Sequence, residues 1–308
     1  MKKEHSDIHA FFVDQLSHWS LAKKNFNNLR FVVEKTICIG EFPIKLQFNP
    51  ERIRSTAANV DSNSISQRKC FLCQNNRPQE QMILDEIVDY DVLVNPYPIF
   101  KHHFTICHSE HIHQDCINFR EMVRFAEMHK DLVVFYNASK SGASAPDHLH
   151  FQAGDKDALP ICEYIDKGEW TFNIDKHDLK IRVDDSLPMP FFHIRCSCKL
   201  SNINRIIDSL TFEKSYRNVM MWSTDSMIEI LIFPRSKHRP DCYFAKDEKQ
   251  IMVSPGAVDM AGCLILPRKE DFDKMDKQII ESIYNEVSVN SVEMKEKMLQ
   301  LQKVISKS

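Results

Sequence analysis

Glycine is scarce in this chain, and its scarcity removes two large classes of nucleotide-binding protein. Only six glycines occur among 308 residues, and they form no glycine-rich phosphate-binding fingerprint. The sequence therefore gives no positive signal for a Rossmann or P-loop domain. A basic surplus is missing as well, because the formal net charge is -3. That balance argues against a general nucleic-acid binder.

Long apolar runs are also absent. No stretch approaches the roughly 18 apolar residues that a membrane-spanning helix needs, and the first residues show no secretory signal pattern. Ten cysteines in a chain without such a leader predict free thiols or metal ligands rather than a disulfide framework. We expect a cytoplasmic protein that binds neither membranes nor nucleic acid.

The order of apolar periodicities predicts an α+β protein. The chain is long enough for about two domains, and we place the boundary between residues 1–165 and 166–308. Each part begins with strands, passes through a helix and returns to strands, which predicts two related halves with mainly antiparallel sheets flanked by helices. A terminal helix is expected over residues 272–287. The polar stretch 55–69 is typical of a mobile loop.

The residues that can carry chemistry centre on a small-residue loop that leads into a strand, residues 141–154. Ser141, Gly142 and Ser144 suit a loop whose backbone amides approach an anion. On a strand from residue 148 to residue 153, His148, His150 and Gln152 share one face. A neutral histidine can attack phosphorus, and an amide can bind a phosphoryl oxygen without protonating a leaving group. An exposed polar strand face without chemistry is the competing interpretation.

The run Gly142-Ala143-Ser144-Ala145-Pro146-Asp147-His148-Leu149-His150-Phe151-Gln152 resembles the active-site signature of the histidine-triad superfamily. It is most similar to the branch with glutamine as the third member, which contains galactose-1-phosphate uridylyltransferase, diadenosine tetraphosphate phosphorylase and GDP-hexose phosphorylase. The sequence from His148 to Gln152 is most similar to that of GDP-hexose phosphorylases. The resemblance implies that His150 becomes nucleotidylated and that Gln152 binds the transferred phosphate. It also implies transfer to phosphate or a sugar phosphate rather than to water.

A second segment, Val94-Asn95-Pro96-Tyr97-Pro98, resembles the turn that contacts the nucleoside in this family. The resemblance implies a substrate-binding role for Asn95. A simple turn made by asparagine and two prolines accounts equally well for the local sequence.

Cys70 and Cys73 have the spacing of half a zinc site. The resemblance to the uridylyltransferases implies that His111 and His148 complete a structural zinc site, which would brace the strand that aims His150. The phosphorylases do not all keep such a site, and His108 or His113 could replace His111. No organic cofactor is expected.

Arg235, Lys237 and His238 follow an apolar strand in the second half and suit a diphosphate or an incoming phosphate. A solvated turn is the alternative for any one of them.

Together these features predict a nucleotidyltransferase that cleaves a nucleoside diphosphate hexose, with GDP-hexose as the leading donor, by using phosphate. Diadenosine tetraphosphate phosphorylase and hexose-1-phosphate uridylyltransferase are the alternatives within the family. A nucleotide-binding protein without turnover and a zinc-held interaction module are the alternatives outside enzymology. The expected partners are a nucleotide sugar and phosphate. The oligomeric state is left open, with a homodimer among the options.

Overall fold

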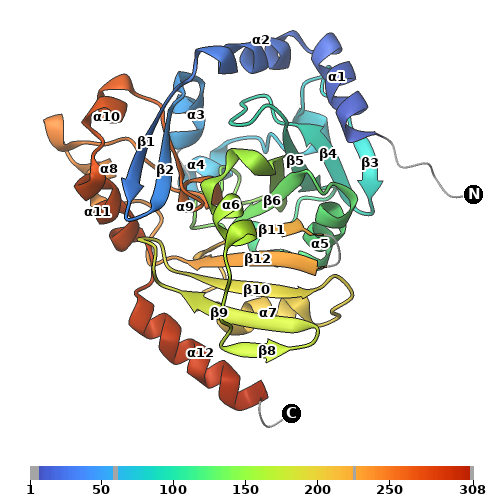
Figure 1. The fold of residues 1–308 in the computed structure, drawn as a ribbon. Coiled ribbons are helices and arrows are strands. Elements are labelled where there is room, and N and C mark those ends of the chain that lie inside the picture. Colours follow the sequence, from blue (N-terminus) through green and yellow to red (C-terminus); the bar gives the residue numbers. More distant parts are fainter. Residues whose placement is uncertain (1–6, 58–61, 225–226, 306–308) are drawn as a thin grey trace, which may run out of the picture.

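A ten-stranded antiparallel sheet forms the centre of the protein in the computed structural model, which describes residues 7–57, 62–224 and 227–305 (Figure 1). In order across the sheet, the strands are β3 (Leu84–Ile87), β4 (Tyr90–Val94), β5 (His103–His108), β7 (His150–Asp155), β6 (Leu132–Asn137), β11 (Arg217–Ser223), β12 (Met227–Pro234), β10 (Phe191–Ser197), β9 (Leu179–Asp184) and β8 (Ile174–Lys176). The predicted α+β class is confirmed.

A second, three-stranded sheet joins the two ends of the chain. It contains β1 (Val33–Ile39), β2 (Phe42–Phe48) and β13 (Cys263–Leu266). β1 and β2 form a hairpin, and β13 pairs parallel to β2. A late segment of the chain therefore packs directly on an early one, and the first half is not a separate body.

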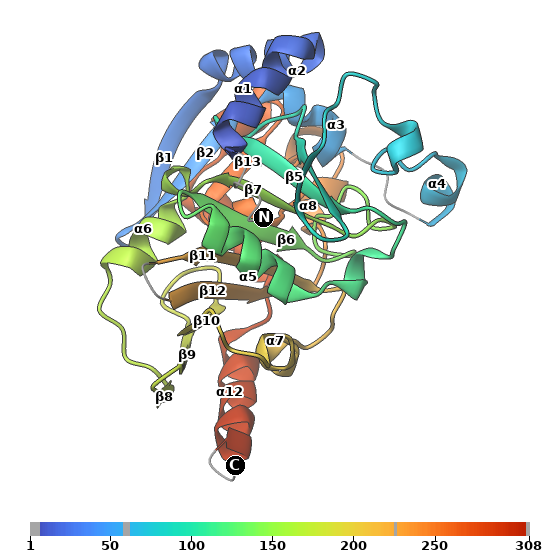
Figure 2. The ribbon, with the colours of Figure 1, turned by 90° about the vertical axis from the view of Figure 1, so that its right-hand side faces the viewer.

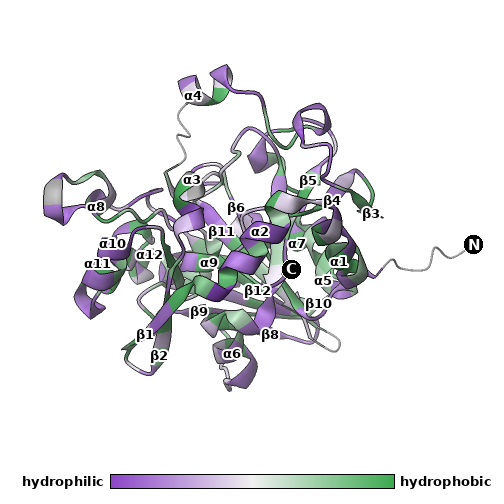
Figure 3. Cartoon of the chain, turned by 90° about the horizontal axis from the view of Figure 1, so that it is seen from above, coloured by the Kyte–Doolittle hydropathy of each residue, from purple (hydrophilic) through white to green (hydrophobic). Residues whose placement is uncertain are grey.

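The helices lie mainly outside the sheets. They are α1 (Ile8–His18), α2 (Ser20–Asn28), α3 (Ile53–Thr56), α4 (Ser62–Gln67), α5 (Phe119–Met128), α6 (Pro160–Lys167), α7 (Ile203–Leu210), α8 (Asp241–Phe244), α9 (Ala257–Met260), α10 (Lys269–Lys274), α11 (Lys277–Val287) and α12 (Ser291–Ile305). Turning the molecule by 90° shows α5 and α7 against the central sheet and α12 projecting at one end (Figure 2). Hydrophilic residues predominate along α10 and α11 (Figure 3).

The order of elements repeats along the chain. The series β3, β4, β5, α5, β6, β7 is followed by the series β8, β9, β10, α7, β11, β12, and the two series meet where β6 pairs with β11. The strands of both series thus belong to one sheet. The boundary at residue 165 stays a prediction, and it falls inside α6.

Both faces of the central sheet are buried at its middle strands, which explains why β6 and β12 read as nearly continuous apolar runs. In β6, Val134 and Tyr136 pack in one apolar cluster, while Val133 and Phe135 pack in the other. Every residue of β6 is buried. Since strand side chains alternate between faces, a strand with six buried residues needs a core on each side.

Several local predictions differ from the structure. The helix expected over residues 272–287 is two helices, because Asp276 caps a new start: its carboxylate accepts from Ile279 N at 2.8 Å. A further helix, α12, follows it. In the polar stretch 55–69, residues 58–61 lie outside the described residues, and the remainder includes α4. None of the helices within the described residues combines the length and apolarity that crossing a bilayer requires.

Truncating Ile232 tests the importance of the shared core. Ile232 is fully buried in β12 and belongs to the same apolar cluster as Val134. We expect Ile232→Ala to lower the free energy of unfolding by about 2–5 kcal/mol, because it removes buried methylene groups and leaves a cavity. Urea denaturation measures this loss. Val13→Ala, at an α1 position that is 68% exposed, is the control and should change stability by less than about 0.5 kcal/mol. Equal losses for the two variants would contradict the assigned core.

Candidate active site

His150 is the first residue of β7 and lines a cavity of about 480 Å³. β7 runs antiparallel between β5 and β6, so its backbone is held from both sides. The Gln114 side chain adds a third support, since it accepts from His150 N at 2.9 Å and donates to His150 O at 2.8 Å. The imidazole therefore stands on a rigid backbone.

One hydrogen bond determines which nitrogen of His150 is free. Nδ1 lies 2.8 Å from the carbonyl oxygen of His148. A carbonyl oxygen can only accept, so Nδ1 carries the proton and Nε2 keeps its lone pair. Burial lowers the pKa of His150 to about 4. The ring is thus neutral at neutral pH, with Nε2 as its nucleophilic nitrogen.

Gln152 also lines this cavity, and His103 orients its amide. Ile99 N–H donates to His103 Nδ1 at 3.2 Å, so the His103 proton is on Nε2, which donates to Gln152 Oε1 at 3.0 Å. Asn95 Nδ2 donates to the same oxygen at 3.4 Å. Burial lowers the pKa of His103 to about 3, which keeps this ring neutral. The NH₂ end of Gln152 is left to donate to a ligand.

Asn95 lines the cavity at the turn after β4. Its oxygen accepts from Tyr97 N at 2.9 Å, and its NH₂ group donates to Thr105 Oγ1 at 3.0 Å. The side chain builds the turn and also lines the cavity, so the turn is confirmed and a substrate contact of Asn95 stays a prediction.

Two of the three loop residues expected to bind the substrate, Gly142 and Ser144, line the cavity. Gly142 has φ +95°, and a Cβ atom on it would come 2.8 Å from Gly256 Cα. Only glycine satisfies both constraints. Ser141 is fully buried behind the loop, where its hydroxyl donates to Ser215 O at 3.2 Å.

Cys70, Cys73, His111 and His148 come together beside the loop, with their ligand atoms within 4.8 Å of one another. Cys70 Sγ lies 3.3 Å from His148 Nδ1, and Cys73 Sγ lies 3.2 Å from His111 Nδ1. Tetrahedral zinc, with Zn–S of about 2.3 Å and Zn–N of about 2.0 Å, separates neighbouring ligand atoms by roughly 3.5 Å. The four side chains fit such a site.

The unused nitrogen of His148 supports the same interpretation. His148 Nε2 lies 2.8 Å from the carbonyl oxygen of His108, so Nε2 carries the proton and Nδ1 is free to ligate. Burial lowers the pKa of His148, which favours the neutral ring that a metal requires. His148 precedes β7 and points to the cysteines, so it does not share a face with His150 and Gln152 as the strand pattern predicted.

The Cys70–Cys73 turn also forms a wall of the His150 cavity. Phe71 and Leu72, between the two cysteines, line that cavity, and Trp19 lies on its wall from the junction of α1 and α2. Phe71 is 48% exposed, which leaves its ring accessible. Aromatic and apolar side chains at the rim suit a flat nucleobase.

A smaller chamber of about 50 Å³ adjoins the main cavity. Arg52, Asn137, Gly142 and Gln152 line both spaces, and Ser254 lies on the wall of the smaller one. Arg52 donates to Tyr97 O at 2.8 Å, and burial lowers its pKa to about 10, so it remains charged at neutral pH.

Asp259 also lines the chamber; its carboxyl oxygens accept from Gly256 N and Ile265 N, and burial raises its pKa to about 6. Arg52 and the Asn137 and Gln152 amides are the groups of the chamber that could donate to a small anion.

The structure does not bring Arg235, Lys237 and His238 to the cavity. Arg235 is 2% exposed and donates to several backbone carbonyl oxygens. Lys237 forms ion pairs with Asp241 and Glu286. Direct contact of these three residues with a phosphate therefore remains a prediction without geometric support.

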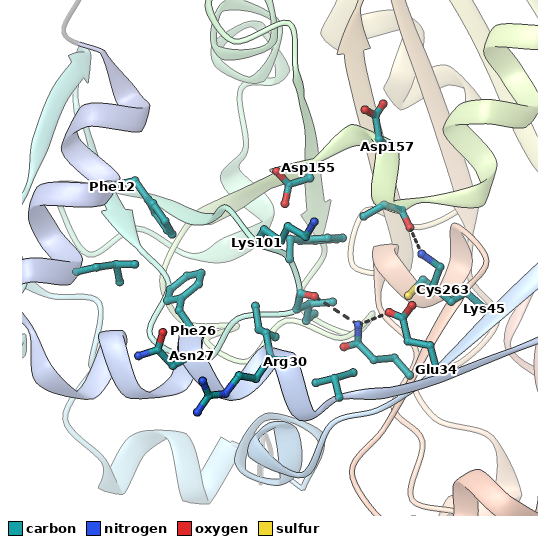
Figure 4. Close-up of a pocket in the computed structure, with 17 residues that line it drawn as sticks. Phe12, Phe26, Asn27, Arg30, Glu34, Lys45, Lys101, Asp155, Asp157 and Cys263 are labelled. Atoms are coloured by element: carbon teal, nitrogen blue, oxygen red, sulfur yellow. Dashed lines mark hydrogen bonds between the residues drawn. The ribbon is translucent and has the colours of Figure 1, made fainter.

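A larger cavity of about 890 Å³ lies between α1, α2 and the β1–β2 hairpin (Figure 4). Neither His150 nor Gln152 is among its lining residues. Several of its polar groups bond to neighbouring protein atoms: Lys45 Nζ donates to Ala158 O at 3.1 Å, and Gln47 donates to Glu34 at 3.2 Å. The volume of this cavity is therefore no argument for a catalytic role.

Sequence reasoning missed three residues of the site, Asn137, Arg52 and His103. Asn137 ends an apolar strand directly before the loop, a position that could have signalled a ligand contact. Arg52 follows the Asn49-Pro50 turn after β2, and no local pattern connects it with residue 150. His103 begins β5 and becomes informative only when the strand register places it near Gln152.

Two family models match separate parts of the chain. Residues 11–155 match a domain of unknown function, DUF4922, and residues 199–307 match the model described as GDPGP1-like, C-terminal domain. A comparison with curated proteins finds no match.

Among solved structures, the chain is similar to the yeast Ap4A phosphorylase Apa2. The complex of Apa2 with AMP aligns with a TM-score of 0.55 and 15% identity, over 89% of this chain and 96% of Apa2. The complex with Ap4A gives 0.54 and 15%, over 87% and 96%. At this identity the likeness shows the fold. The GDPGP1-like match and the shared fold support the resemblance of residues 142–152 to the nucleotidyltransferase and phosphorylase branch of the histidine-triad superfamily.

Proposed function

We propose that the protein is a nucleotide phosphorylase that works through a nucleotidyl-His150 intermediate. The observation that carries this proposal is the His150 ring, neutral and fixed in the tautomer that leaves Nε2 unprotonated, on a residue that lines the same cavity as Gln152. Such a ring is a nucleophile that needs no separate base.

In the first step, Nε2 of His150 attacks the α-phosphorus of the donor, and the bond from this phosphorus to the bridging oxygen breaks. The leaving group departs as a phosphate ester, which needs no proton at neutral pH. Gln152 can hold a phosphoryl oxygen but cannot supply a proton, which suits this leaving group. The Nδ1 proton of His150 stays on the ring, hydrogen-bonded to His148 O.

In the second step, an oxygen of inorganic phosphate attacks the same phosphorus and the P–N bond breaks. The products are a nucleoside diphosphate and neutral His150. The small chamber beside the cavity supports phosphate as the acceptor, because its volume of about 50 Å³ suits a small anion and Arg52 lies on its wall. A buried guanidinium is a strong donor to phosphate oxygens.

A GDP-hexose and diadenosine tetraphosphate are the two best-supported donors. The match of residues 199–307 to the GDPGP1-like model favours the GDP-hexose, whereas the fold shared with Apa2, whose structures contain AMP and Ap4A, favours diadenosine tetraphosphate to a comparable extent. The third option is a uridylyl transfer, with a UDP-hexose as the donor and a hexose 1-phosphate as the acceptor. The nucleotidyl-histidine step is common to all three.

We also propose that Cys70, Cys73, His111 and His148 hold a structural zinc ion. When bound, zinc would fix the segment before β7 and the Cys70–Cys73 turn. Phe71 and Leu72 lie in that turn and line the cavity, so a bound metal would also hold the part of the cavity wall proposed to contact the nucleotide.

Intact-mass spectrometry tests the nucleophile. The protein is incubated without phosphate, separately with GDP-hexose, UDP-hexose, ADP-hexose and diadenosine tetraphosphate. We expect a gain of one nucleoside monophosphate with one donor, discharged by added phosphate, and a loss of turnover of about 10⁴-fold or more in His150→Asn. His177→Asn, on a fully accessible ring outside the site, is the matched control. No adduct with any donor, together with retained nucleotide binding in His150→Asn, would favour a binding protein.

Metal analysis tests the zinc site. We expect about one zinc per chain, a marked loss of zinc in Cys73→Ser, and a higher KM for the nucleotide, because the wall at Phe71 and Leu72 loses its anchor. Cys38→Ser replaces an exposed cysteine outside the cluster and should retain the metal. Equal zinc contents in the two variants would contradict the site. Unfolding on chelation with His150→Asn fully functional would favour a zinc-held interaction module.

Arg52→Gln tests the acceptor chamber. Loss of a charge-assisted hydrogen bond, worth about 1.5–3 kcal/mol, should raise the KM for phosphate by about 10-fold to 100-fold. Adduct formation does not involve the acceptor and should change less than the KM for phosphate, although Arg52 also lines the main cavity. Steady-state kinetics and single-turnover adduct formation separate the two steps. Arg205→Gln, at an exposed arginine, is the control. An unchanged KM for phosphate would place the acceptor elsewhere.

A further inference from the structure

Asn137 has the geometry of a phosphoryl-binding residue, because hydrogen bonds from the protein side fix the orientation of its side-chain amide. It ends β6 and lines both the main cavity and the small chamber. Its side-chain oxygen accepts two hydrogen bonds, from Asn218 Nδ2 at 2.7 Å and from Ala257 N at 2.7 Å. With the oxygen engaged on the protein side, the NH₂ group is the end that faces the ligand spaces.

The direction of the Asn218 amide is set by Arg235. Arg235 Nη1 donates to Asn218 Oδ1 at 2.6 Å. A guanidinium can only donate, so the oxygen of Asn218 must face it and the NH₂ group must face the other way. That NH₂ group donates to Asn137 Oδ1 and to Ser141 O, each at 2.7 Å.

Arg235 is in turn held by the backbone. It donates to Val287 O at 3.0 Å, Pro255 O at 2.8 Å, Lys237 O at 3.2 Å and His238 O at 3.1 Å. Five acceptors, counting Asn218, surround this buried guanidinium. Its geometry therefore suits a positioning role rather than contact with a phosphate.

The same residues anchor the loop that follows β6. The carbonyl of Ser141 accepts from Asn218, and Gly142 packs so closely on Gly256 that a Cβ atom would not fit. The second half thus supports the first-half site at two adjacent points, the Asn137 amide and the loop backbone.

We propose that Asn218 and Arg235 are positioning residues that present an N–H donor of Asn137, rather than its carbonyl oxygen, to the phosphoryl group transferred by His150. This inference rests on the proposed function. A reversed Asn137 amide would place an oxygen against the phosphoryl oxygens and would forfeit the bond from Ala257 N. His103 orients the Gln152 amide in the same way, because its Nε2 donates to Gln152 Oε1 and leaves the NH₂ group for the ligand.

Asn218→Asp tests the orientation with little change of shape. The carboxylate keeps an acceptor for Arg235 but has no donor for Asn137, whose amide is then expected to turn its NH₂ group inward. Loss of one preorganised donor typically reduces the rate of the chemical step by about 10²-fold to 10³-fold. We expect a decrease of this size in single-turnover adduct formation.

A double-mutant cycle separates this role from a general structural one. If Asn218 acts mainly through Asn137, Asn218→Asp should cost at least about 100-fold in the wild-type background and at least about tenfold less than that in Asn137→Ala, where only the loss of the bond to Ser141 O remains. Equal losses in the two backgrounds, or no loss in either, would overturn the inference. Arg235→Lys is the second variant. It should slow adduct formation more than Arg217→Lys, because the buried Arg217, next to Asn218 on β11, bonds to Asp208 and Thr211 instead.

Calorimetric titration with GDP and with ADP provides a readout that does not depend on turnover. If the wild type forms no adduct but binds one of these nucleotides, the proposed function fails. The double-mutant cycle of Asn218→Asp and Asn137→Ala is then measured as nucleotide affinities instead of rates of adduct formation. Affinity that falls in Asn218→Asp only when Asn137 is present supports the orientation, and affinity independent of Asn218 refutes it. If neither nucleotide binds and no donor, UDP-hexose included, forms an adduct, both proposals fail.

Discussion

The site depends on the hydrogen bond between the His150 ring and the carbonyl oxygen of His148. This bond puts the proton on Nδ1, leaves the lone pair on Nε2, and fixes the plane of the ring. Burial then keeps the ring neutral by lowering its pKa. Because the acceptor is the backbone of His148, whose side chain lies in the Cys70–Cys73–His111 cluster, a metal there would also hold the carbonyl that orients the nucleophile.

The two amides that can hold the phosphoryl group are oriented by the same principle. In each case a group that can only donate a hydrogen bond determines the orientation of its neighbour. The backbone N–H of Ile99 sets the tautomer of His103, which orients the Gln152 amide. The guanidinium of Arg235 orients the Asn218 amide, which orients the Asn137 amide. One chain of bonds lies within the first half and the other begins in the second. The continuous sheet, with β6 paired to β11, holds the two in register.

The sequence was informative where function depends on local spacing. The loop and strand around His150 predicted that His150 and Gln152 share one face, and both line one cavity, while the nucleophilic role of His150 stays a prediction. Cys70-x-x-Cys73 predicted half of the cysteine and histidine cluster. The strand pattern was less reliable for His148, since β7 begins only at His150. Apolar periodicity was sufficient for the α+β class because buried strands and amphipathic helices leave direct traces in the sequence.

Residues brought in by tertiary packing could not be predicted from the sequence. Arg52, Asn218 and Trp19 reach the site from distant segments, and no spacing rule connects them with His150. Arg235 shows the converse: a basic residue after a strand suggested anion binding, but its guanidinium is buried among carbonyl oxygens, which suits the positioning role proposed for it. Charge in a sequence does not reveal whether a guanidinium faces a ligand or the protein interior.

The most direct test of the account is the identity of the nitrogen that carries the nucleotide. Protein labelled with ¹⁵N-histidine, nucleotidylated without phosphate and examined by NMR, would show phosphorus coupled to one ring nitrogen. The account predicts coupling to Nε2 of His150, with Nδ1 still protonated. Coupling to Nδ1, or an adduct on His148 or on another residue, would contradict it.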